Sequence, residues 1–443
     1  MALDFTHDPG ARSWVPSAQE AGCDFALQNL PWCMFRPHGA GEAAFRPGVG
    51  IGDQVLDLAA LSASGLLQGA AAQATAAAAT GPRLNALCAQ GPGAWRALRH
   101  ALFRLLSEQA GSAEQQALQP LLSPQADADY SLPTQVANYT DFYTSIHHAR
   151  NTGRVMRGGL VPEGTDLVMP NFRSMPIAYH GRASSVVVSG HPVRRPNGQL
   201  PTGAGAAPAF GATQRLDYEL ELGVLIGPGN ALGEPVRLAD AAAQVFGIVL
   251  LNDWSARDIQ SWEMAPLGPF QAKNFATSVS PWVVTWDALA PYRTAWAPDR
   301  DSPPPLPYLD DAGVRQCGAL DIQLEAWLQA PQGDALRLSR TSFRHQSWTV
   351  PQMIAHHTVG GCNLQPGDLL GSGTISGPGP SEAGTMIEIT HGGRQPLTLP
   401  DGSQRGFLAD GDALVLRGWC ERNGAARVGF GECRGVVLPA LVY

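Results

Sequence analysis

The stretch Leu-Asp-Tyr-Glu-Leu-Glu-Leu, residues 216–222, decides both the expected fold and the expected chemistry. Its apolar residues alternate with acidic ones, and this period of two predicts a β-strand with one buried face. Asp217, Glu219 and Glu221 would then share the opposite face, and the stretch contains no basic residue to offset their charge. A hard divalent cation would remove the repulsion between such carboxylates. The stretch alone leaves two interpretations open, a cation site and a solvated acidic strand face.

The composition is that of a globular protein. The chain has 443 residues, enough for two or three domains, and 44% of them are hydrophobic, which suffices for a packed core. Its 50 Gly and 36 Pro predict many turns and a β-rich fold. The net charge of −8 argues against nucleic acid as a partner. The seven Cys are scattered without a C-x-x-C pair, which predicts reduced thiols rather than disulfides or a zinc site.

Neither the N-terminus nor the longest apolar tract predicts a membrane or secreted protein. The first seven residues lack the basic and apolar regions of a signal peptide. The Ala-rich tract 66–81 is interrupted by Gln, Gly and Thr, which indicates a surface helix or loop rather than a membrane span. We therefore expect a cytoplasmic protein without a membrane partner.

A proline-rich segment divides the chain into two expected domains. Residues 119–133 contain three Pro and no clear period, so we interpret them as the joint between domains at 1–130 and 131–443. In the N-terminal domain, a Gly-Asp turn between two apolar runs within 48–58 predicts a hairpin. The spacing of apolar residues from Trp95 to Leu106 predicts a helix.

The larger domain is expected to mix strands with short helices. The continuous apolar run 245–251 predicts a strand buried on both faces, and 237–245 predicts a short helix. Residues 139–157 look like a turn followed by a helix, with Thr140 as its N-cap. Further strand patterns occur at 186–188, 216–227, 319–328, 384–390 and 412–420.

Asp141 and His148 are the first candidates for chemistry. On a helix they would lie on one face, because they are seven residues apart, whereas Tyr143 would lie elsewhere. A carboxylate and an imidazole on one face can serve as a metal ligand and a general base. The alternative is an acid favoured by the helix dipole together with a surface histidine.

A second candidate group follows the buried strand. Asp253 stands at its end, where functional groups are common. Ser255 and Asp258 suggest a capped helix start. On that helix one stripe would carry Arg257, Gln260 and Met264. A guanidinium beside an amide suits a carboxylate or a developing oxyanion. The alternative is a surface helix whose arginine pairs with a nearby acid.

Three further positions are candidates, and each also has an ordinary structural interpretation. Lys273 follows a turn, where a lysine is usually solvated. The Gly-rich loop 371–380 lacks a nucleotide-binding pattern, but it could place the Thr374 hydroxyl near an anionic ligand. Glu388 has apolar neighbours, which raise the pKa of a carboxyl group or call for a histidine partner. The oxygen-rich candidate set suits Mg²⁺ or Ca²⁺ better than Zn²⁺.

Taken in order, these stretches resemble the fumarylacetoacetate hydrolase family. The resemblance runs from Asp-Phe-Ala-Leu-Gln-Asn-Leu-Pro (24–31) nearly to the C-terminus. Several long blocks in the right order are more specific than any single motif. The strongest are Tyr-Thr-Asp-Phe-Tyr (139–143), Ala-Tyr-His-Gly-Arg-Ala-Ser-Ser-Val-Val-Val-Ser-Gly (178–190), Leu-Asp-Tyr-Glu-Leu-Glu (216–221), Asn-Asp-Trp-Ser-Ala-Arg-Asp-Ile-Gln (252–260), Leu-Gly-Pro-Phe-Gln-Ala-Lys (267–273) and Gly-Ser-Gly-Thr-Ile-Ser-Gly-Pro (371–378).

The resemblance implies a fold that is mainly β with some α, and it assigns roles to residues. It implies a small N-terminal SH3-like β-barrel domain and a C-terminal mixed β-roll domain, assembled as a homodimer. The ligands of a divalent cation, Mg²⁺ or Ca²⁺, would be Asp141, Glu219, Glu221 and Asp253. His148 would be the base that activates water, oriented by Glu388. Charge on the substrate would be stabilised by Arg257, Gln260 and Lys273. Substrate contacts would come from Tyr143, Arg157, Tyr179 and Thr374, and a second cation would lie near Lys273 and Thr277.

The activity implied by the resemblance is hydrolysis of a carbon–carbon bond in a diketo acid, 4-fumarylacetoacetate. A metal that chelates the 1,3-dioxygen unit acts as a Lewis acid, a neutral His148 takes a proton from water, and Arg157 suits a substrate carboxylate. Met264 stands where the family pattern has Tyr, which bears on substrate fit. His147 stands where Gln is expected and could perturb the pKa of His148. The alternatives are acylpyruvate hydrolysis or decarboxylation on the same scaffold, and a non-catalytic binding protein.

Overall fold

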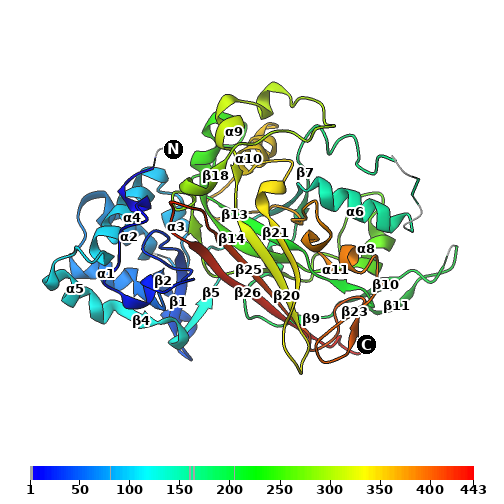
Figure 1. Cartoon of the computed structure of the whole chain (residues 1–443), viewed down its shortest axis with the longest axis horizontal. Coiled ribbons are helices and arrows are strands. Elements are labelled where there is room, and N and C mark those ends of the chain that lie inside the picture. The colour runs from blue at the N-terminus through cyan, green and yellow to red at the C-terminus, as the bar shows by residue number, and fades with distance from the viewer. Residues whose placement is uncertain (1–2, 80, 159–160, 163–164, 204) are drawn as a thin grey trace.

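The apolar run after Gln244 forms β14 (Val245–Asp253), a strand that is buried along its whole length. The computed structural model describes residues 3–79, 81–158, 161–162, 165–203 and 205–443. A small N-terminal domain and a larger C-terminal domain lie side by side, and β14 runs through the larger one (Figure 1). The strand predicted at 245–251 is therefore confirmed.

The N-terminal domain is built on an antiparallel sheet in the order β4-β3-β2-β1-β5. Its strands are β1 (Trp32–Pro37), β2 (Arg46–Ile51), β3 (Gln54–Asp57), β4 (Leu122–Pro124) and β5 (Ala128–Ser131). The chain between β3 and β4 is helical: α1 (Leu58–Ser64), α2 (Gly69–Ala79), α3 (Asn85–Cys88), α4 (Pro92–Leu106) and α5 (Ser112–Leu118). The hairpin expected at 48–58 and the helix expected from Trp95 are both present.

The C-terminal domain contains the remaining strands and six more labelled helices of the described chain. Its strands are β6 (Tyr139–Tyr143), β7 (Ile177–Gly181), β8 (Val186–Val188), β9 (Val193–Arg194), β10 (Asn197–Leu200), β11 (Ala209–Ala212), β12 (Leu216–Asp217), β13 (Leu220–Ile226), β14, β15 (Ser255–Ala256), β16 (Thr277–Val279), β17 (Val284–Thr285), β18 (Arg293–Thr294), β19 (Ala319–Leu320), β20 (Gln323–Gln329), β21 (Leu336–Ser342), β22 (Leu369–Gly371), β23 (Leu397–Thr398), β24 (Gln404–Arg405), β25 (Ala413–Cys420) and β26 (Val428–Leu438). The helices are α6 (Ile146–Met156), α7 (Leu238–Ala241), α8 (Arg257–Glu263), α9 (Ala312–Cys317), α10 (Val350–Thr358) and α11 (Met386–Ile389).

Both faces of the central sheet are covered. The sheet has the order β7-β6-β22-β13-β14-β16-β8, and a second sheet has the order β21-β20-β25-β26-β9. Leu222 and Val224 of β13 pack on one side with residues of the second sheet, whereas Leu225 packs on the other side with residues of the N-terminal domain. The strand expected at 216–227 exists as β12 and β13, but the prediction of a single buried face was wrong, because the N-terminal domain covers the second face.

Two local predictions were wrong. Residues 139–143 form a strand, β6, and α6 begins only after Ser145, whose side chain, not that of Thr140, accepts the capping hydrogen bond from His148 N–H. Residues 386–389 form the short helix α11 instead of a strand, because the Thr385 side chain caps it through Glu388 N–H. Residues 119–133 contain β4 and β5, and their role as the joint between the domains stays a prediction.

The fold class itself is confirmed, with more strands than helices in the described chain, a small antiparallel sheet domain and a larger domain with mixed sheets. The boundary at 130/131 stays a prediction. The Ala-rich tract forms α2, whose Ala74 and Ala78 are buried in the core of the N-terminal domain. No described helix has the length and apolar character that a membrane crossing requires.

Candidate active site

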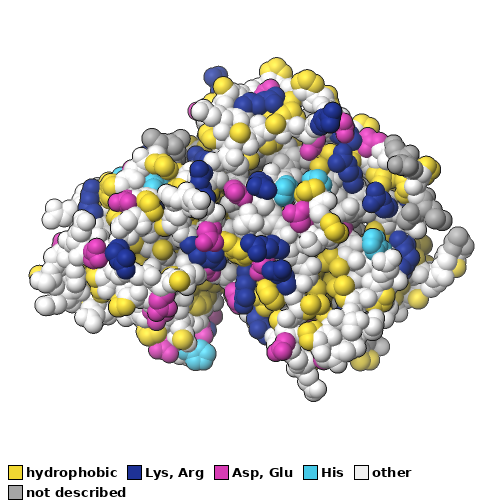
Figure 2. Space-filling view, viewed as in Figure 1, with side chains coloured by type: hydrophobic (Ala, Val, Ile, Leu, Met, Phe, Trp, Pro, Cys, Tyr) yellow, Lys and Arg dark blue, Asp and Glu magenta, His cyan; other side chains and the backbone are white. Residues whose placement is uncertain are grey.

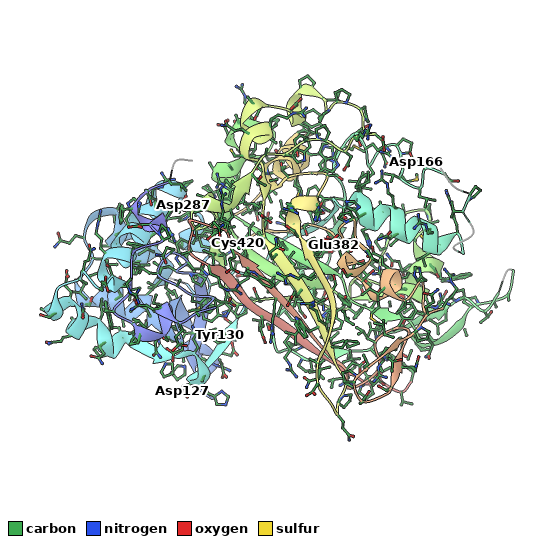
Figure 3. All side chains as sticks on the ribbon, viewed as in Figure 1. Asp127, Tyr130, Asp166, Asp287, Glu382 and Cys420 are labelled. Carbon is green, nitrogen blue, oxygen red and sulfur yellow. The ribbon has the colours of Figure 1, made fainter. Side chains whose placement is uncertain are left out.

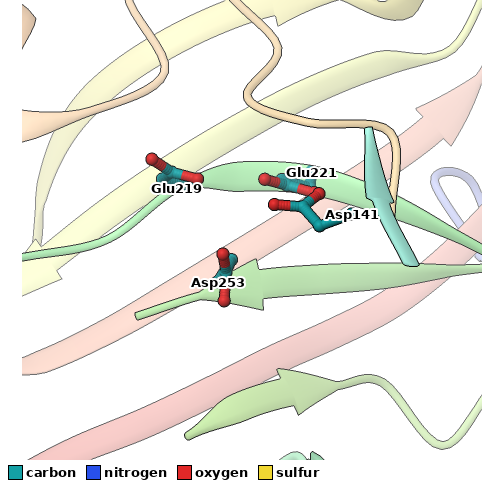
Figure 4. A group of neighbouring side chains, drawn as sticks. All are labelled: Asp141, Glu219, Glu221 and Asp253. Carbon is teal, nitrogen blue, oxygen red and sulfur yellow. The ribbon is translucent and has the colours of Figure 1, made fainter. Parts of the chain in front are cut away.

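Four acidic side chains, three on strands and one directly before a strand, point toward one another inside the C-terminal domain (Figure 4). Asp141 comes from β6, Glu221 from β13, Asp253 from the end of β14, and Glu219 directly precedes β13. In the sheet, β22 separates β6 from β13, and β14 lies on the other side of β13. One oxygen of each carboxylate lies within 4.8 Å of the others, so the expectation that these acids share one place is met by the geometry.

The acidic cluster is buried, and burial dominates its electrostatics. Asp141 is 3% exposed, and Glu221 and Asp253 are 0% exposed. Burial, followed by repulsion from neighbouring carboxylates, raises the pKa of Asp141 and Glu221, and burial raises the pKa of Asp253. Burial also acts to raise the pKa of Glu219, but the charges of Lys273 and Arg257 outweigh it and hold that pKa low. A cation among the acids would favour their charged forms.

The residues of this cluster fit a divalent metal ion. Asp141 Oδ1 and Glu221 Oε1 are buried without a hydrogen-bond partner among the described residues. Gly371 of β22 lies between the two strands, and a Cβ built there would lie 2.7 Å from Asp141 Oδ1 and 3.1 Å from Glu221 Oε2. An all-oxygen set of this kind is preferred by Mg²⁺ and Ca²⁺, and the glycine leaves room for it.

Polar groups surround Asp253. The Lys273 ammonium lies 2.8 Å from Asp253 Oδ2 and 2.6 Å from Glu219 Oε2, and the lysine is buried rather than solvated. Tyr179 Oη donates to Asp253 Oδ2 at 3.0 Å, and Thr277 Oγ1 donates to Asp253 Oδ1 at 3.1 Å. Despite burial, the carboxylates of Asp253 and Glu219 raise the pKa of Lys273, so the lysine stays charged.

Arg257 joins the cluster from α8. Its Nε donates to Asp217 Oδ2 at 2.9 Å, and its Nη1 donates to Glu219 Oε1 at 2.8 Å and to Gln260 Oε1 at 3.2 Å. Nη2 is buried without a partner among the described residues, and so is Thr374 Oγ1. These are two donors that a substrate oxygen could accept from. The sequence predicted that Ser255 and Asp258 cap the start of α8, and this prediction was wrong. Ser255 lies in β15 instead, and Asp258 accepts a hydrogen bond from Gln214 N–H at 2.8 Å.

His148 and Glu388 form a buried pair that joins α6 to α11. His148 Nδ1 lies 2.7 Å from Glu388 Oε2. Glu388 also accepts from Asn151 Nδ2 at 2.8 Å, from Ser376 Oγ at 3.0 Å and from Thr385 Oγ1 at 2.8 Å. With Nδ1–H donating to the carboxylate, the lone pair of Nε2 is left to accept a proton. The arrangement can therefore hold a neutral imidazole in one tautomer.

The cavity between the two domains is not part of this site. It has a volume of about 1060 Å³ and is lined by Phe25, Tyr130 and Trp282, among others. Figure 2 shows the notch between the domains, and Tyr130, labelled in Figure 3, lies on the side of the N-terminal domain that borders it. None of the sequence-predicted site residues lines this cavity.

Comparison with known proteins agrees with the geometry. Residues 138–438 match the family described as "Fumarylacetoacetate (FAA) hydrolase C-terminal", and residues 28–133 match "Fumarylacetoacetase N-terminal". The chain belongs to the fumarylacetoacetate hydrolase family. The resemblance noted in the sequence is thus confirmed, and the two matched regions correspond to the two sheet-based domains.

Individual members of the fumarylacetoacetate hydrolase family are similar over nearly the whole chain. A fumarylacetoacetase of Oryza sativa subsp. japonica is 44% identical over 439 residues, which cover 98% of this chain and 99% of that protein. A fumarylacetoacetase of Bos taurus is 44% identical over 434 residues, covering 97% and 100%. The solved fumarylacetoacetate hydrolase of Exiguobacterium antarcticum is 16% identical with a TM-score of 0.49, covering 93% of this chain and 99% of that one.

Four residues that the sequence singles out make no hydrogen bond to the four acids in the described chain. Tyr143 Oη bonds Thr152 Oγ1 at 3.1 Å, and its ring meets the His148 ring edge-on at 5.2 Å. Arg157 is exposed at the end of α6. Met264 is 45% exposed just after α8. His147 lies 6.1 Å from the ring of His345, and burial lowers its pKa.

Sequence reasoning missed four polar residues that support the site. Asn151, Ser376 and Thr385 hold Glu388, and Asp217 holds Arg257. The signal for Asp217 was its place in the alternating acidic stretch, although it lies outside the cluster of four acids. Asn151 carried no signal, because it is 237 positions from Glu388. Thr385 could have been found, because it stands three residues before Glu388 in the T-x-x-E pattern of a helix start, and Ser376 is twelve positions from Glu388.

Proposed function

We propose that this chain hydrolyses the carbon–carbon bond of 4-fumarylacetoacetate to give fumarate and acetoacetate, a step of tyrosine and phenylalanine breakdown. The observation that carries the proposal is the buried group of Asp141, Glu219, Glu221 and Asp253, with unpartnered oxygens, in a domain that also holds the His148–Glu388 pair. Similarity to relatives named fumarylacetoacetase over nearly their full length supports the choice of substrate.

The His148–Glu388 pair supplies the general base. His148 Nε2 takes a proton from water while Nδ1–H stays bonded to Glu388, so the carboxylate fixes the tautomer and stabilises the imidazolium that forms. The resulting hydroxide adds to the carbonyl carbon on the fumaryl side. The bond to the central methylene then breaks, giving fumarate and the acetoacetate enolate, which takes up the proton held on His148.

The remaining residues hold charge and orientation. Arg257 Nη2, Lys273 and the Thr374 hydroxyl are buried donors for the oxygens on which negative charge develops. A divalent cation held by the four acids would supply Lewis-acid polarisation of the 1,3-dicarbonyl unit. Gln260 keeps the Arg257 guanidinium in place through Nη1. Arg157, exposed at the end of α6, suits a carboxylate of the substrate.

His148→Ala tests the base. We expect kcat to fall by about 10²–10⁴-fold, because a positioned general base contributes that much. Binding of Mg²⁺ or Ca²⁺, measured by calorimetry, should be unchanged, since His148 is not among the four acids. Turnover is followed through the ultraviolet absorbance of the diketone. His191→Ala, at an exposed position outside the site, is the matched control. Undiminished turnover in His148→Ala would refute the assignment.

Metal removal tests the cation. A chelator-treated protein should lose turnover and regain it with Mg²⁺ or Ca²⁺, and titration with each ion decides which of the two binds more tightly. Full activity after thorough stripping would contradict the metal-dependent mechanism. The second cation near Lys273 and Thr277 is tested by the stoichiometry of the same titrations.

A second candidate activity is hydrolysis or decarboxylation of acylpyruvates, and Met264 favours it. This side chain lies one turn beyond Gln260 and offers no hydroxyl to a substrate. A panel of diketo acids separates the two activities: a higher kcat/KM for acylpyruvates than for fumarylacetoacetate would replace the first proposal. The expected homodimer and the cytoplasmic location stay predictions, to be checked by light scattering and by fractionation.

A further inference from the structure

Asp217 connects two parts of the site that come from distant segments of the chain. Its side chain is 0% exposed. Oδ2 accepts from Arg257 Nε at 2.9 Å and from Ile387 N–H at 3.0 Å. Oδ1 accepts from Met386 N–H at 2.7 Å and from Tyr218 N–H at 2.9 Å. One buried carboxylate thus holds both an arginine of α8 and the first backbone amides of α11.

Each side of this link bears a group that the proposed mechanism uses. Arg257 carries the unpartnered donor Nη2, and its Nη1 contacts Glu219. Helix α11 carries Glu388, one residue after Ile387, and Glu388 bonds His148. No hydrogen bond joins Arg257 directly to α11 among the described residues. Asp217 is therefore the shortest path between the charge-stabilising arginine and the carboxylate that orients the base.

We propose that Asp217 is a positioning residue that fixes Arg257 and the Glu388-bearing helix α11 relative to each other. The inference rests on the proposed function, in which both groups act on one substrate. Asp217 itself lies outside the group of acids that would hold the cation. Its contribution is geometric, since a displacement of about 1 Å at a reacting group can cost a hundredfold in rate.

The link requires a carboxylate rather than a polar side chain in general. Each of its two oxygens accepts from two donors, and each accepts from one backbone amide of α11. An asparagine has the same shape but only one acceptor oxygen, so its NH₂ group would face donors on one side. Asp217→Asn therefore keeps the volume of the side chain but loses one α11 amide, either Met386 N–H or Ile387 N–H, and in the second case it loses Arg257 Nε as well.

The experiment compares Asp217→Asn with a matched control in the metal-loaded protein. Asp57 is also buried, and it accepts from Arg46 Nε and, at 2.9 Å, from Ala60 N–H, all within the N-terminal domain. Asp217→Asn should lower kcat by about tenfold to a hundredfold with little change in KM. It should also speed amide hydrogen exchange over residues 385–390. Asp57→Asn should do neither, even where it lowers stability as much.

Two further variants test whether Asp217 acts through its partners. In a Glu388→Gln background, the loss caused by Asp217→Asn should shrink to less than about threefold, because groups that act as a unit are not additive. Arg257→Gln, which leaves Asp217 in place, should also speed exchange over 385–390, since Arg257 reaches α11 only through Asp217. This variant keeps the inference testable if Asp217→Asn does not fold.

The same fold-loss from Asp217→Asn in both backgrounds would overturn the inference, and so would unchanged exchange over 385–390 in Asp217→Asn and Arg257→Gln. The exchange measurement needs no substrate. If the wild-type protein does not hydrolyse fumarylacetoacetate, the proposed function fails by itself, and faster exchange still supports the link while unchanged exchange refutes it.

Discussion

Glu388 keeps a negative charge inside the protein because donors surround it. Burial acts to raise the pKa of this carboxyl, but His148, Asn151 and Thr385 outweigh it and leave the pKa below its ordinary value. A carboxyl with a lowered folded-state pKa stabilises the protein above the pKa of the unfolded chain. That contribution disappears as the pH falls through the lower, folded-state pKa.

Glu388→Gln should therefore destabilise the protein in a pH-dependent way. At pH 7 we expect a loss of roughly 2 kcal/mol in the free energy of unfolding, the usual contribution of hydrogen bonds to a charged group. The loss should shrink as the pH drops below the unfolded-state value of about 4.3. Urea unfolding of both proteins with chelator present, from pH 7 downward, measures it. A difference that stays constant with pH would contradict the role of the charge.

Single residues differ in how far the sequence reveals them. Asp141, Glu219, Glu221 and Asp253 stand in blocks that resemble the family, and His148 follows one of these blocks by five residues, so their identity could be predicted and the structure only had to bring them together. Asp217 could not be assigned in this way. Its partner Met386 N–H is 169 positions away, and a backbone amide leaves no mark in the sequence. The same holds for Asn151, whose role depends on where α11 lies.

At the scale of elements, a helix-capping side chain decided between helix and strand where the alternation of apolar residues did not. Residues 384–390 alternate like a strand, yet Thr385 caps α11 and turns Glu388 toward His148. Residues 139–143 had the opposite error: they were expected as part of a turn before a helix, but they form a strand, because β7 pairs with all five in antiparallel and β22 pairs with 139–141 in parallel. Parallel pairing joins segments distant in the chain, so local patterns do not predict it.

The strand β22 should be sensitive to its last residue. Gly371 is paired with Asp141 of β6 on one side and with Gly223 of β13 on the other, so it lies beside the acidic cluster in the sheet. In Gly371→Ala, the new Cβ would lie 2.7 Å from Asp141 Oδ1 and push that carboxylate away. We expect the affinity for Mg²⁺ or Ca²⁺, measured by calorimetry, to fall at least tenfold, the order seen when groups that orient metal ligands are disturbed.

Gly211→Ala is the control for this variant. The nearest atom to a Cβ at Gly211 of β11 is Leu200 Cδ1, 3.8 Å away, so an alanine fits there without displacement. Its cation affinity should equal that of the wild type. Unchanged affinity in Gly371→Ala as well would mean that Asp141 does not contribute to the cation site.

At the scale of the whole molecule, the two domains share one apolar core. Phe246, near the start of β14, lies with its ring 4.7 Å from Trp32 and 5.3 Å from Trp95 of the N-terminal domain. Trp32 and Val283 also exchange backbone hydrogen bonds, at 2.9 and 2.7 Å. The sequence predicted both domains, but the packing of one on the sheet of the other depends on side chains that only the folded chain brings together. This packing explains why β13 and β14 lack a solvated face.

Phe246→Ala should loosen the domains from each other without disturbing the site. We expect a loss of about 3–5 kcal/mol in unfolding free energy, the usual cost of removing a buried phenylalanine. The wild type should unfold in one transition, whereas the variant should show tryptophan fluorescence changing before far-ultraviolet circular dichroism. Asp253 lies at the opposite end of β14, about 23 Å away at the usual rise per residue. The kcat of the variant should therefore equal that of the wild type at denaturant concentrations below the unfolding transition. Phe210→Ala, at a 63% exposed position, should leave the transition unchanged. Coincident transitions in Phe246→Ala would show that other contacts suffice to couple the domains.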